Sequence, residues 1–486
     1  MQSPLRRLTT ASASLLLATL LALLGNTLTQ HGIARQGLAQ WSAWRVGQSP
    51  WSWNLRQPRD LVAGRAFGAG RLVAARDGLA VVFTGGAVQL GLRVARPIPL
   101  HDVPMLRLDF AHSLALPAAI IIRSRLSSEA CEAAASPLPE GAGTQWVDLA
   151  LLHWRCHGMR SSLPQRAAML RLRIVGPRGA RLVIRRVALQ PTVHLAPGPP
   201  TGLAHWRKAQ TPGRIPVVEL PAGWSSRLLD ERDAVWRVDP AAVVLPAMTR
   251  PHAVAKHPAW RCNALAIAAC ILLMLFGWPR RDPGRGALLL QALACLFPVI
   301  LIALGVGNSG KPDLWSGLLV ALALGYALLI GSRAPPGLGP WRWLAPWREW
   351  WLPMLPVALL LGLWLQDGVR SLGLGELLRY LPWALLQQYL LLVFVARRID
   401  TVLPGRAPAV LACATLFALA HAPNTALMLL AFTGGLWWTW WFLQRRALLP
   451  VVIAHALAGA ILQAITSNSG WLRSLAIGAR YLGKTG

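Results

Sequence analysis

Apolar residues along this chain follow two different patterns, and the change comes near residue 259. Between about residues 30 and 190 they alternate with polar residues over short stretches, as in Leu106-Arg-Leu-Asp-Phe110 and Leu170-Arg-Leu-Arg-Ile174. Such alternation is typical of strands that bury one face. After residue 259 the apolar residues form long continuous runs, which are typical of membrane helices. The pattern predicts a β domain followed by a helical membrane region.

The first region has further features of an all-β domain. Leu182-Val-Ile-Arg-Arg-Val-Ala-Leu189 is a third alternating stretch, and Val175-Gly-Pro-Arg-Gly179 before it predicts a hairpin turn. Several short strands separated by turn signals predict an antiparallel β-sandwich of the jelly-roll type over residues 30–190. Residues 191–258 are rich in proline and lack periodicity, so we expect a linker or a loosely appended segment there.

The second region is predicted to be polytopic. Its apolar runs cover residues 262–278, 286–306, 314–332, 350–366, 380–396, 407–421, 425–443 and 447–466. Most of these are long enough to cross about 30 Å of hydrocarbon at about 1.5 Å per residue. Residues 1–29 read as a membrane anchor or signal, and no clean cleavage site follows, which favours an uncleaved anchor. We therefore expect about nine spans, with membrane helices in 259–349 and a separate helical domain in 350–486.

The distribution of basic residues predicts the orientation. With the N-terminus in the cytoplasm, the cytoplasmic ends of the helices are the basic ones, with Arg280-Arg281, Arg397-Arg398 and Arg445-Arg446. The opposite loops carry only Lys311, Arg370 and Arg379, whereas Arg473 in the tail goes against the rule. This arrangement predicts a multi-pass protein of the bacterial inner membrane with an extracytoplasmic β domain.

Composition excludes one class of partner. The chain of 486 residues is 54% hydrophobic and 14% charged, which fits a membrane protein. Its formal net charge of +30 does not indicate nucleic-acid binding, because the arginines are scattered and no RNA-binding signature or zinc-finger spacing is present. Cys131 and Cys156 are the only cysteines of the predicted exported region, so we expect a disulfide between them. No metal ligand set is expected, and the residues identify no cofactor.

Strongly polar residues inside the C-terminal apolar runs are the candidate site. Gln387 and Gln388 are consecutive, His421 ends one run, and His455 lies in the middle of the last. Polar groups at bilayer depth are costly, so a functional site is their default interpretation. The alternative is structural, because amide and imidazole groups also link membrane helices by hydrogen bonds.

Two further residues belong to this candidate site. Phe417 stands four residues before His421, so the two share one helix face. We expect Phe417 to pack at the border of the site, where it is a candidate substrate contact. Pro423 ends that helix, and Asn424 after it either caps the next helix or contacts substrate.

The stretch from about Leu377 to Gln463 resembles the CPBP (CAAX-processing and bacteriocin-immunity) family of intramembrane proteases. The family pattern is Glu-Glu-x-x-x-Arg on one helix, Phe-x-x-x-His on a later helix, and His-x-x-x-Asn on a third. Phe417-Ala-Leu-Ala-His421 matches the second motif, and His455 stands at the histidine of the third. The resemblance implies a helical membrane fold in which Gln387, Gln388, His421 and His455 form the catalytic centre.

This sequence departs from the family pattern at three places. Gln387-Gln388 replaces the glutamate pair, Leu392 stands at the arginine position, and Gly459 at the asparagine position. In the family a glutamate is thought to activate water, while the histidines and the asparagine orient it and stabilise the oxyanion. A carboxamide cannot act as a general base, because it has no titratable lone pair near neutral pH.

Three functions fit these observations. The first is a CPBP-like intramembrane endopeptidase that processes a membrane protein or a C-terminal sorting signal near the outer leaflet, with the β domain recruiting the substrate or a glycan. The second is a non-catalytic, CPBP-derived binding or immunity protein, which the glutamine pair favours. The third is a component of envelope polysaccharide export, which rests on the jelly-roll prediction alone.

Overall fold

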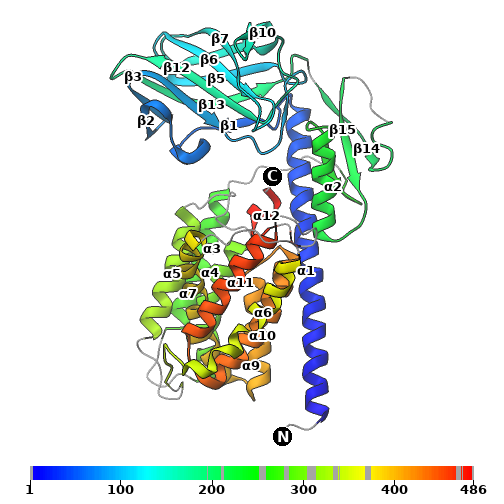
Figure 1. Ribbon diagram of the computed structural model, residues 1–486, viewed down its shortest axis with the longest axis vertical. Coiled ribbons are helices and arrows are strands. Elements are labelled where there is room, and N and C mark those ends of the chain that lie inside the picture. The colour runs from blue at the N-terminus through cyan, green and yellow to red at the C-terminus, as the bar shows by residue number, and fades with distance from the viewer. Residues whose placement is uncertain are drawn as a thin grey trace. The chain divides into compact units, whose positions relative to one another are not determined.

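The computed structural model describes residues 4–193, 195–208, 213–250, 259–278, 284–303, 314–331, 338, 340–366, 374–466, 472 and 474–483. The chain forms two compact units (Figure 1). The first contains Met1–Gly32, Trp224–Arg227 and Lys256–Gly483, and the second contains Ile33–Gly223, Leu228–Ala255 and Lys484–Gly486. Several of the residues used for orientation lie outside the described residues, namely Arg280, Arg281, Lys311, Arg370 and Arg473. The predicted orientation therefore stays a prediction.

The N-terminal helix is longer than the predicted anchor. Helix α1 covers Pro4–Arg45, so residues 30–45 are helical and do not begin the β domain. No proline interrupts this segment, and its alanines, glutamines and leucines are good helix formers, so the helix continues after the apolar stretch ends. The boundary between the two units falls within this helix, after Gly32.

Most strands of the second unit belong to one sheet. The strands are β1 (Ser52–Asn54), β2 (Phe67–Ala75), β3 (Gly78–Leu92), β4 (Ile98–Pro99), β5 (Met105–His112), β6 (Leu116–Arg123), β7 (Cys131–Leu138), β8 (Gly143–Asp148), β9 (Trp154–Cys156), β10 (Met159–Ser161), β11 (Arg166–Ala167), β12 (Met169–Gly176) and β13 (Arg181–Gln190). Eleven of them form a sheet of order β10-β9-β7-β6-β12-β3-β13-β5-β8, with β1 on β13 and β2 on β3, while β4 and β11 pair separately. Short 3₁₀ turns connect some strands at η1 (Pro58–Asp60), η2 (Val62–Gly64) and η3 (Leu149–Leu151).

Strand β3 explains why the sheet is continuous. Its first half, up to Val82, pairs with β13, and its second half, from Gly86, pairs with β12. Gly85 and Gly86 at the change have φ angles of 107° and 119°, which side chains disfavour. The predicted hairpin between β12 and β13 is wrong, because each strand pairs with a different half of β3 and not with the other.

The sheet curls over its own apolar face. Residues of β5, β6, β7, β8, β12 and β13 line one small interior space, among them Phe110, Ile120 and Leu172. The Gln145 side chain on β8 donates hydrogen bonds to the Ser136 and Pro137 carbonyl oxygens on β7. The β domain is therefore a half-closed barrel formed by one sheet, rather than the expected sandwich of two sheets.

The expected linker at 191–258 is largely folded. Strands β14 (Ala196–Gly202), β15 (Arg214–Leu220) and β16 (Val243–Pro246) form a parallel sheet, and helix α2 (Ser225–Val238) connects the last two. Buried apolar residues such as Val217 and Val243 join the core of the second unit. Proline content misled the prediction, because the prolines of β14 lie in an edge strand, which tolerates them.

The first unit is a bundle of apolar helices. They are α3 (Ala259–Phe276), α4 (Arg285–Ala303), α5 (Leu314–Gly331), η5 (Trp347–Glu349), α6 (Trp351–Gln366), α7 (Leu374–Gln388), η6 (Tyr389–Ala396), α8 (Arg397–Val402), α9 (Arg406–Leu419), α10 (Thr425–Arg445), α11 (Leu449–Ile465) and α12 (Ala479–Gly483). By length and composition, Thr9–Arg45, Arg285–Ala303 and Thr425–Arg445 are the helices of the described chain that reach membrane-spanning size, and five shorter apolar helices accompany them. The count of about nine spans stays a prediction.

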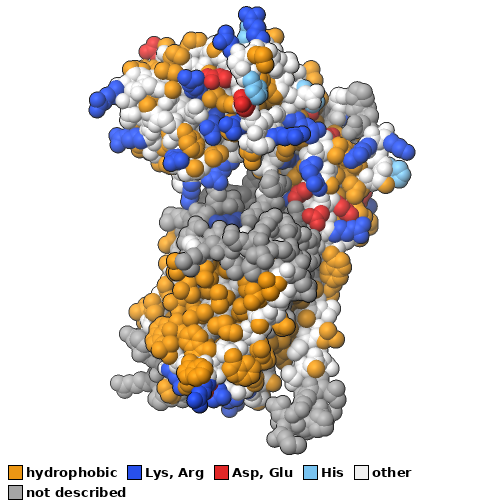
Figure 2. Space-filling view, viewed as in Figure 1, with side chains coloured by type: hydrophobic (Ala, Val, Ile, Leu, Met, Phe, Trp, Pro, Cys, Tyr) orange, Lys and Arg blue, Asp and Glu red, His pale blue; other side chains and the backbone are white. Residues whose placement is uncertain are grey.

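Basic side chains mark one end of this bundle. Arg446 pairs with Asp400 at 2.9 Å, and Arg445 and Arg342 both pair with Glu349. Figure 2 shows basic side chains at one end of a surface that is otherwise mostly apolar. Charged ends around an apolar middle are typical of a helix bundle in a bilayer.

Candidate active site

The glutamine pair lies where one long helix changes its winding. Helix α7 ends at Gln388, and the π-helical segment η6 continues it directly into α8. A π-helical turn shifts the side chains that follow it around the helix, and such turns are frequent at functional sites. In η6 all residues from Leu390 to Ala396 are buried, so this helix lies in the middle of the bundle.

His455 is held on both sides of its ring. It lies in α11 and is buried. The Gln388 Nε2 atom lies 2.9 Å from His455 Nδ1, and the Tyr380 hydroxyl oxygen lies 3.4 Å from His455 Nε2. An amide nitrogen can only donate, so in this arrangement His455 Nδ1 accepts and Nε2 carries the proton. That proton points to the Tyr380 hydroxyl.

His421 has the opposite arrangement. It follows the end of α9, where its backbone N–H donates to the Ala418 carbonyl oxygen. Its Nδ1 lies 2.7 Å from the Phe417 carbonyl oxygen, which can only accept. His421 therefore carries its proton on Nδ1, and its Nε2 keeps a free lone pair. The two imidazoles differ in the chemistry that each can offer at Nε2.

One aromatic ring contacts both imidazoles. The Phe417 ring stands edge-on to both, with centroid distances of 4.8 Å to His421 and 5.5 Å to His455. The Trp438 ring lies 5.4 Å from His455 on another side. The predicted place of Phe417 beside the histidines agrees with this geometry, and its contacts are packing contacts.

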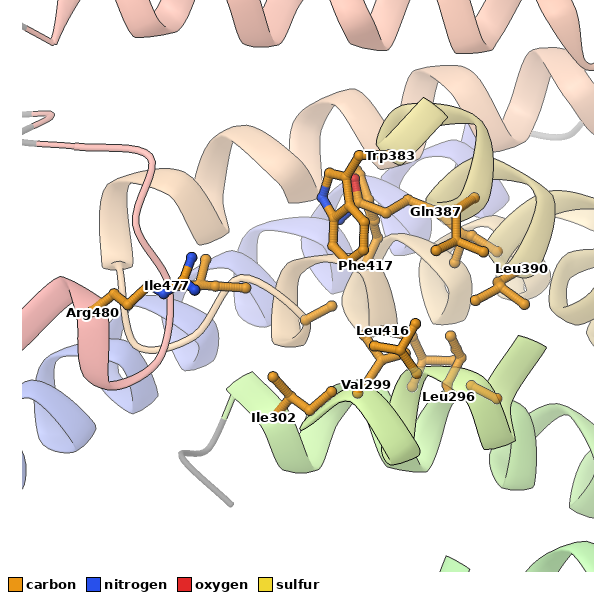
Figure 3. A pocket seen from close by; sticks show the side chains of 16 residues that line it. Leu296, Val299, Ile302, Trp383, Gln387, Leu390, Leu416, Phe417, Ile477 and Arg480 are labelled. Carbon is orange, nitrogen blue, oxygen red and sulfur yellow. The ribbon is translucent and has the colours of Figure 1, made fainter. Parts of the chain in front are cut away.

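A cavity of about 460 Å³ opens onto this group. It is lined by His421, His455, Gln387, Tyr380 and Phe417, together with apolar residues of α6, α10 and α11. A second cavity of about 530 Å³ lies beside it, and Figure 3 shows its largely apolar lining. Trp383, Gln387, Phe417, Ile477 and Arg480 line both cavities, so these five residues form the wall between them.

The two glutamines take different positions. Gln387 borders both cavities, and its Oε1 atom is buried without a hydrogen-bond partner among the residues described. Gln388 is completely buried behind His455 and lines neither cavity. The structure therefore brings together Gln387, His421 and His455 at the cavity, while Gln388 contacts the site through His455.

Asn424 is engaged elsewhere. Its side-chain oxygen accepts from the Leu427 backbone N–H and caps α10, and its Nδ2 donates to the carbonyl oxygens of Ser474 and Ala476. It does not line the cavity of the histidines. Of the two roles considered from the sequence, the structure gives Asn424 that of a helix cap, which also ties down the segment that carries Ile477.

Tyr380 is a site residue that the sequence did not reveal. A Cβ atom added at Gly459 would lie 2.4 Å from Tyr380 Cε1, so the missing side chain at position 459 leaves the space that the tyrosine ring fills. Position 459 is where the family motif has asparagine. The tyrosine therefore brings a hydroxyl to His455 from another helix. Tyr380 lies 75 residues before His455, so no motif or spacing in the sequence connected the two.

No described residue that lines either cavity is an aspartate or glutamate. Among the residues with described positions, no three His, Cys, Asp or Glu side chains gather as metal ligands. The polar groups of the described lining are imidazole, amide, hydroxyl and indole groups and the Arg480 guanidinium.

The two cysteines of the second unit are bonded to each other. Cys131 and Cys156 stand opposite each other on the neighbouring strands β7 and β9, with their Cα atoms 4.2 Å apart, and form a disulfide. This places the pair on the β domain, so it takes no part in the histidine site.

Comparison with known proteins identifies one part of the chain. No curated protein matches the sequence. The sequence model of the type II CAAX prenyl endopeptidase Rce1-like family matches residues 377–461, which contain Tyr380, both glutamines and both histidines. The match covers less than half of the chain. Together with the apolar helices, it indicates a membrane protein whose C-terminal helical region is similar to the Rce1-like family, of the CPBP type.

Proposed function

We propose that the chain is an intramembrane endopeptidase of the CPBP type in which His421 serves as the general base. The observation that carries the proposal is that both imidazoles border one cavity and that their Nδ1 atoms face different partners, an amide nitrogen and a carbonyl oxygen, which assigns opposite protonation to the two Nε2 atoms. A peptidase needs a base for water and a donor for the oxyanion, and this pair offers one of each. The Rce1-like match of the same segment supports a peptidase at the family level.

In this mechanism His421 Nε2 takes a proton from a water molecule, and the hydroxide attacks the scissile carbonyl carbon. The carbonyl oxygen becomes an oxyanion. The Tyr380 hydroxyl, polarised by the proton on His455 Nε2, and the Gln387 amide are the donors that stabilise it. The imidazolium of His421 then gives its proton to the leaving amine as the C–N bond breaks.

The depth of the site supports a substrate that enters from the membrane. Gln388 stands nine residues before Arg397 in one continuous helix, about 14 Å, and His455 stands six residues after the start of α11 at Leu449, about 9 Å. If the basic end faces the cytoplasm, Gln388 and His455 lie near the middle of a core of about 30 Å. His421 follows the end of α9 that is far from Arg406, so it lies further toward the outer side. The proposed substrate is a membrane protein or a C-terminal sorting signal that is cut near the outer leaflet of a bacterial inner membrane.

The test is to compare the C-termini of membrane proteins, by mass spectrometry, in cells with the native chain and with His421→Ala. We expect unprocessed precursors to accumulate with His421→Ala and with His455→Ala. The matched control is His205→Ala, an exposed histidine of the second unit, which should process normally. Full processing by both site variants, at native protein levels, would contradict the proposal.

A non-catalytic binding protein is the second candidate. The observation that favours it is the absence of a carboxylate from the described lining of both cavities. It predicts that binding partners are captured but never cleaved. If Gln387→Glu with Gln388→Glu created cleavage that the native chain lacks, the chain would be a descendant of a protease that has kept only the binding site.

A further inference from the structure

The second unit carries an open polar groove with a volume of about 770 Å³. Strands β1, β5, β8 and β13 and the turn between β2 and β3 contribute to it. The polar side chains that line it are those of Asn54, Arg56, Arg76, Asp77, Arg107, Asp109, Thr144, Arg185 and Arg186. The groove belongs to a region that the family match does not cover.

The charges of this groove are unbalanced. Five arginines face two aspartates, which leaves a formal surplus of three positive charges. Asp109 is occupied, because Arg107 and Thr144 both donate to its Oδ1 atom at 2.8 Å. The side chains of Arg56, Arg76 and Arg185 are exposed and form no ion pair or hydrogen bond with the residues that the structure describes. Figure 2 shows many basic and few acidic side chains on the visible face of the β region.

An exposed aromatic ring extends the same sheet face. Alternation along β5 turns Leu106, Leu108 and Phe110 inward and Arg107 outward. Trp146 on β8 is the cross-strand partner of Arg107, and 47% of its surface is exposed. The Arg107 guanidinium lies 5.4 Å from the centre of the Trp146 ring. A flat aromatic surface therefore adjoins the arginine groove.

We propose that this groove binds an acidic carbohydrate chain. Arginine recognises carboxylates through paired N–H donors, and free arginines at a concave surface attract anions. Trp146 offers an apolar face on which the C–H side of a sugar ring can stack, while its edge stays wet. Asn54 and Thr144 can hydrogen-bond to hydroxyl groups. A ligand that carries carboxylates, hydroxyls and flat apolar faces matches all three features, whereas an isolated phosphate would use only the arginines. This proposal does not depend on peptidase activity.

The test measures binding of oligogalacturonate, a chain of carboxylated sugars, to the full-length chain in detergent by isothermal titration calorimetry. Neutral malto-oligosaccharide of the same length, dextran sulfate and vesicles that contain phosphatidylglycerol are the comparison ligands. We expect oligogalacturonate to bind and the neutral oligosaccharide to bind at least tenfold more weakly.

Variants separate stacking from charge. Trp146→Ala should weaken oligogalacturonate binding about tenfold, while Trp146→Phe should keep most of it. The triple variant Arg56→Gln, Arg76→Gln, Arg185→Gln should weaken binding about 100-fold, because each charge-assisted hydrogen bond is strong. Arg160→Gln, which removes an exposed arginine of β10 that does not line the groove, is the matched control and should bind normally.

Three results would overturn the proposal. The first is that oligogalacturonate does not bind. The second is that Trp146→Ala and the native chain bind oligogalacturonate equally. The third is that dextran sulfate or anionic vesicles bind more strongly than oligogalacturonate and that Trp146→Ala does not change their binding. The last result would assign the groove to charge alone. All the altered side chains are exposed, so unfolding is not expected, and thermal unfolding of each variant checks this.

Discussion

The histidine cavity and the arginine groove use polar residues in opposite ways. In the cavity a few polar groups lie buried among apolar side chains, and His421 and His455 each have a fixed hydrogen-bond partner on the protein. In the groove many charged groups are exposed, and several arginines have no partner among the described residues. The cavity therefore depends on the geometry of single side chains, whereas the groove depends on summed charge.

This difference decides how each region responds to substitution. A buried polar group that loses its partner keeps its full desolvation cost, so single changes in the cavity should have large and specific effects. An exposed charge is screened by water and salt, so single changes in the groove should be mild and roughly additive. The following predictions test this contrast and the independence of the two units.

The largest effect is expected from removing the covalent link in the β domain. Replacing Cys131 and Cys156 together by serine should lower the free energy of unfolding of the second unit by about 3 kcal/mol, because a loop of this length is no longer closed in the unfolded chain. Hydrogen exchange of the β6 and β7 amides measures this, and the amides of α10 and α11 should be unaffected. Reductant should destabilise the native chain equally and leave the double variant unchanged. Equal loss of protection in both units would show that the units do not unfold separately.

The sequence predicted the strands of the β domain but not how they pair. Alternation at Leu106–Phe110 and Leu170–Ile174 correctly predicted strands β5 and β12, because one buried face imposes a period of two. The pairing of β12 and β13 with the two halves of β3 could not be predicted, because it depends on a bend at Gly85 and Gly86 that alternation does not record. The alternation of apolar and polar residues within a strand predicts which face of that strand is buried. It does not predict which other strand pairs with it.

The candidate site was predictable to a similar degree. Motif spacing pointed to His421, His455 and Gln387, which border one cavity in the structure. Tyr380 was missed because its link to position 459 exists only after α7 packs on α11. Asn424 gave two interpretations because capping and substrate binding require the same side-chain chemistry.

The second prediction concerns this tyrosine. Gly459→Ala should destabilise the helical unit by about 1–3 kcal/mol, because the added methyl group collides with the Tyr380 ring. In the double variant, Tyr380→Ala should remove most of that cost. A double-mutant cycle should therefore give a coupling energy whose sign is opposite to that of the destabilisation by Gly459→Ala. Gly325→Ala in α5, where an added Cβ meets nothing within 4 Å, is the matched control. Denaturant unfolding in detergent measures all four, and additive effects would refute the contact.

The third prediction separates the two glutamines. Gln388→Leu should destabilise the helical unit by about 1 kcal/mol and free the His455 ring, because the hydrogen bond to Nδ1 is lost. Gln387→Leu should cost less, since the buried Gln387 Oε1 atom has no hydrogen-bond partner among the described residues. Nitrogen-15 NMR of the imidazoles reports the tautomers. We expect the His455 signals to shift with Gln388→Leu only, and equal shifts in both variants would contradict the assignment.

The smallest effect concerns the pH dependence of the β unit. Burial raises the pKa of Asp239, and the charge of Asp102 adds to this, while the backbone N–H groups of Ala241 and Ala242 and the positive charge of Arg96 act in the opposite direction. Burial likewise raises the pKa of Asp102, against the nearby His101 and Arg166. A carboxyl group whose pKa is higher in the folded state binds its proton more tightly in that state. Its contribution to the free energy of unfolding is therefore fully present below the unfolded pKa and is lost as pH rises through the folded pKa.

As pH rises from the unfolded pKa of aspartate, about 4, through the raised folded pKa values, these two groups should therefore make the second unit less stable. Asp239→Asn keeps an acceptor for the backbone N–H groups of Ala241 and Ala242 but cannot ionise, so it should flatten this slope and slightly stabilise the unit at neutral pH. Asp77→Asn, at an exposed aspartate of the arginine groove, is the matched control for replacing a carboxylate by an amide. Thermal unfolding of the second unit at several pH values measures this. A steeper slope for Asp239→Asn would show that the Asp239 carboxylate is stabilised by Arg96 rather than penalised by its burial.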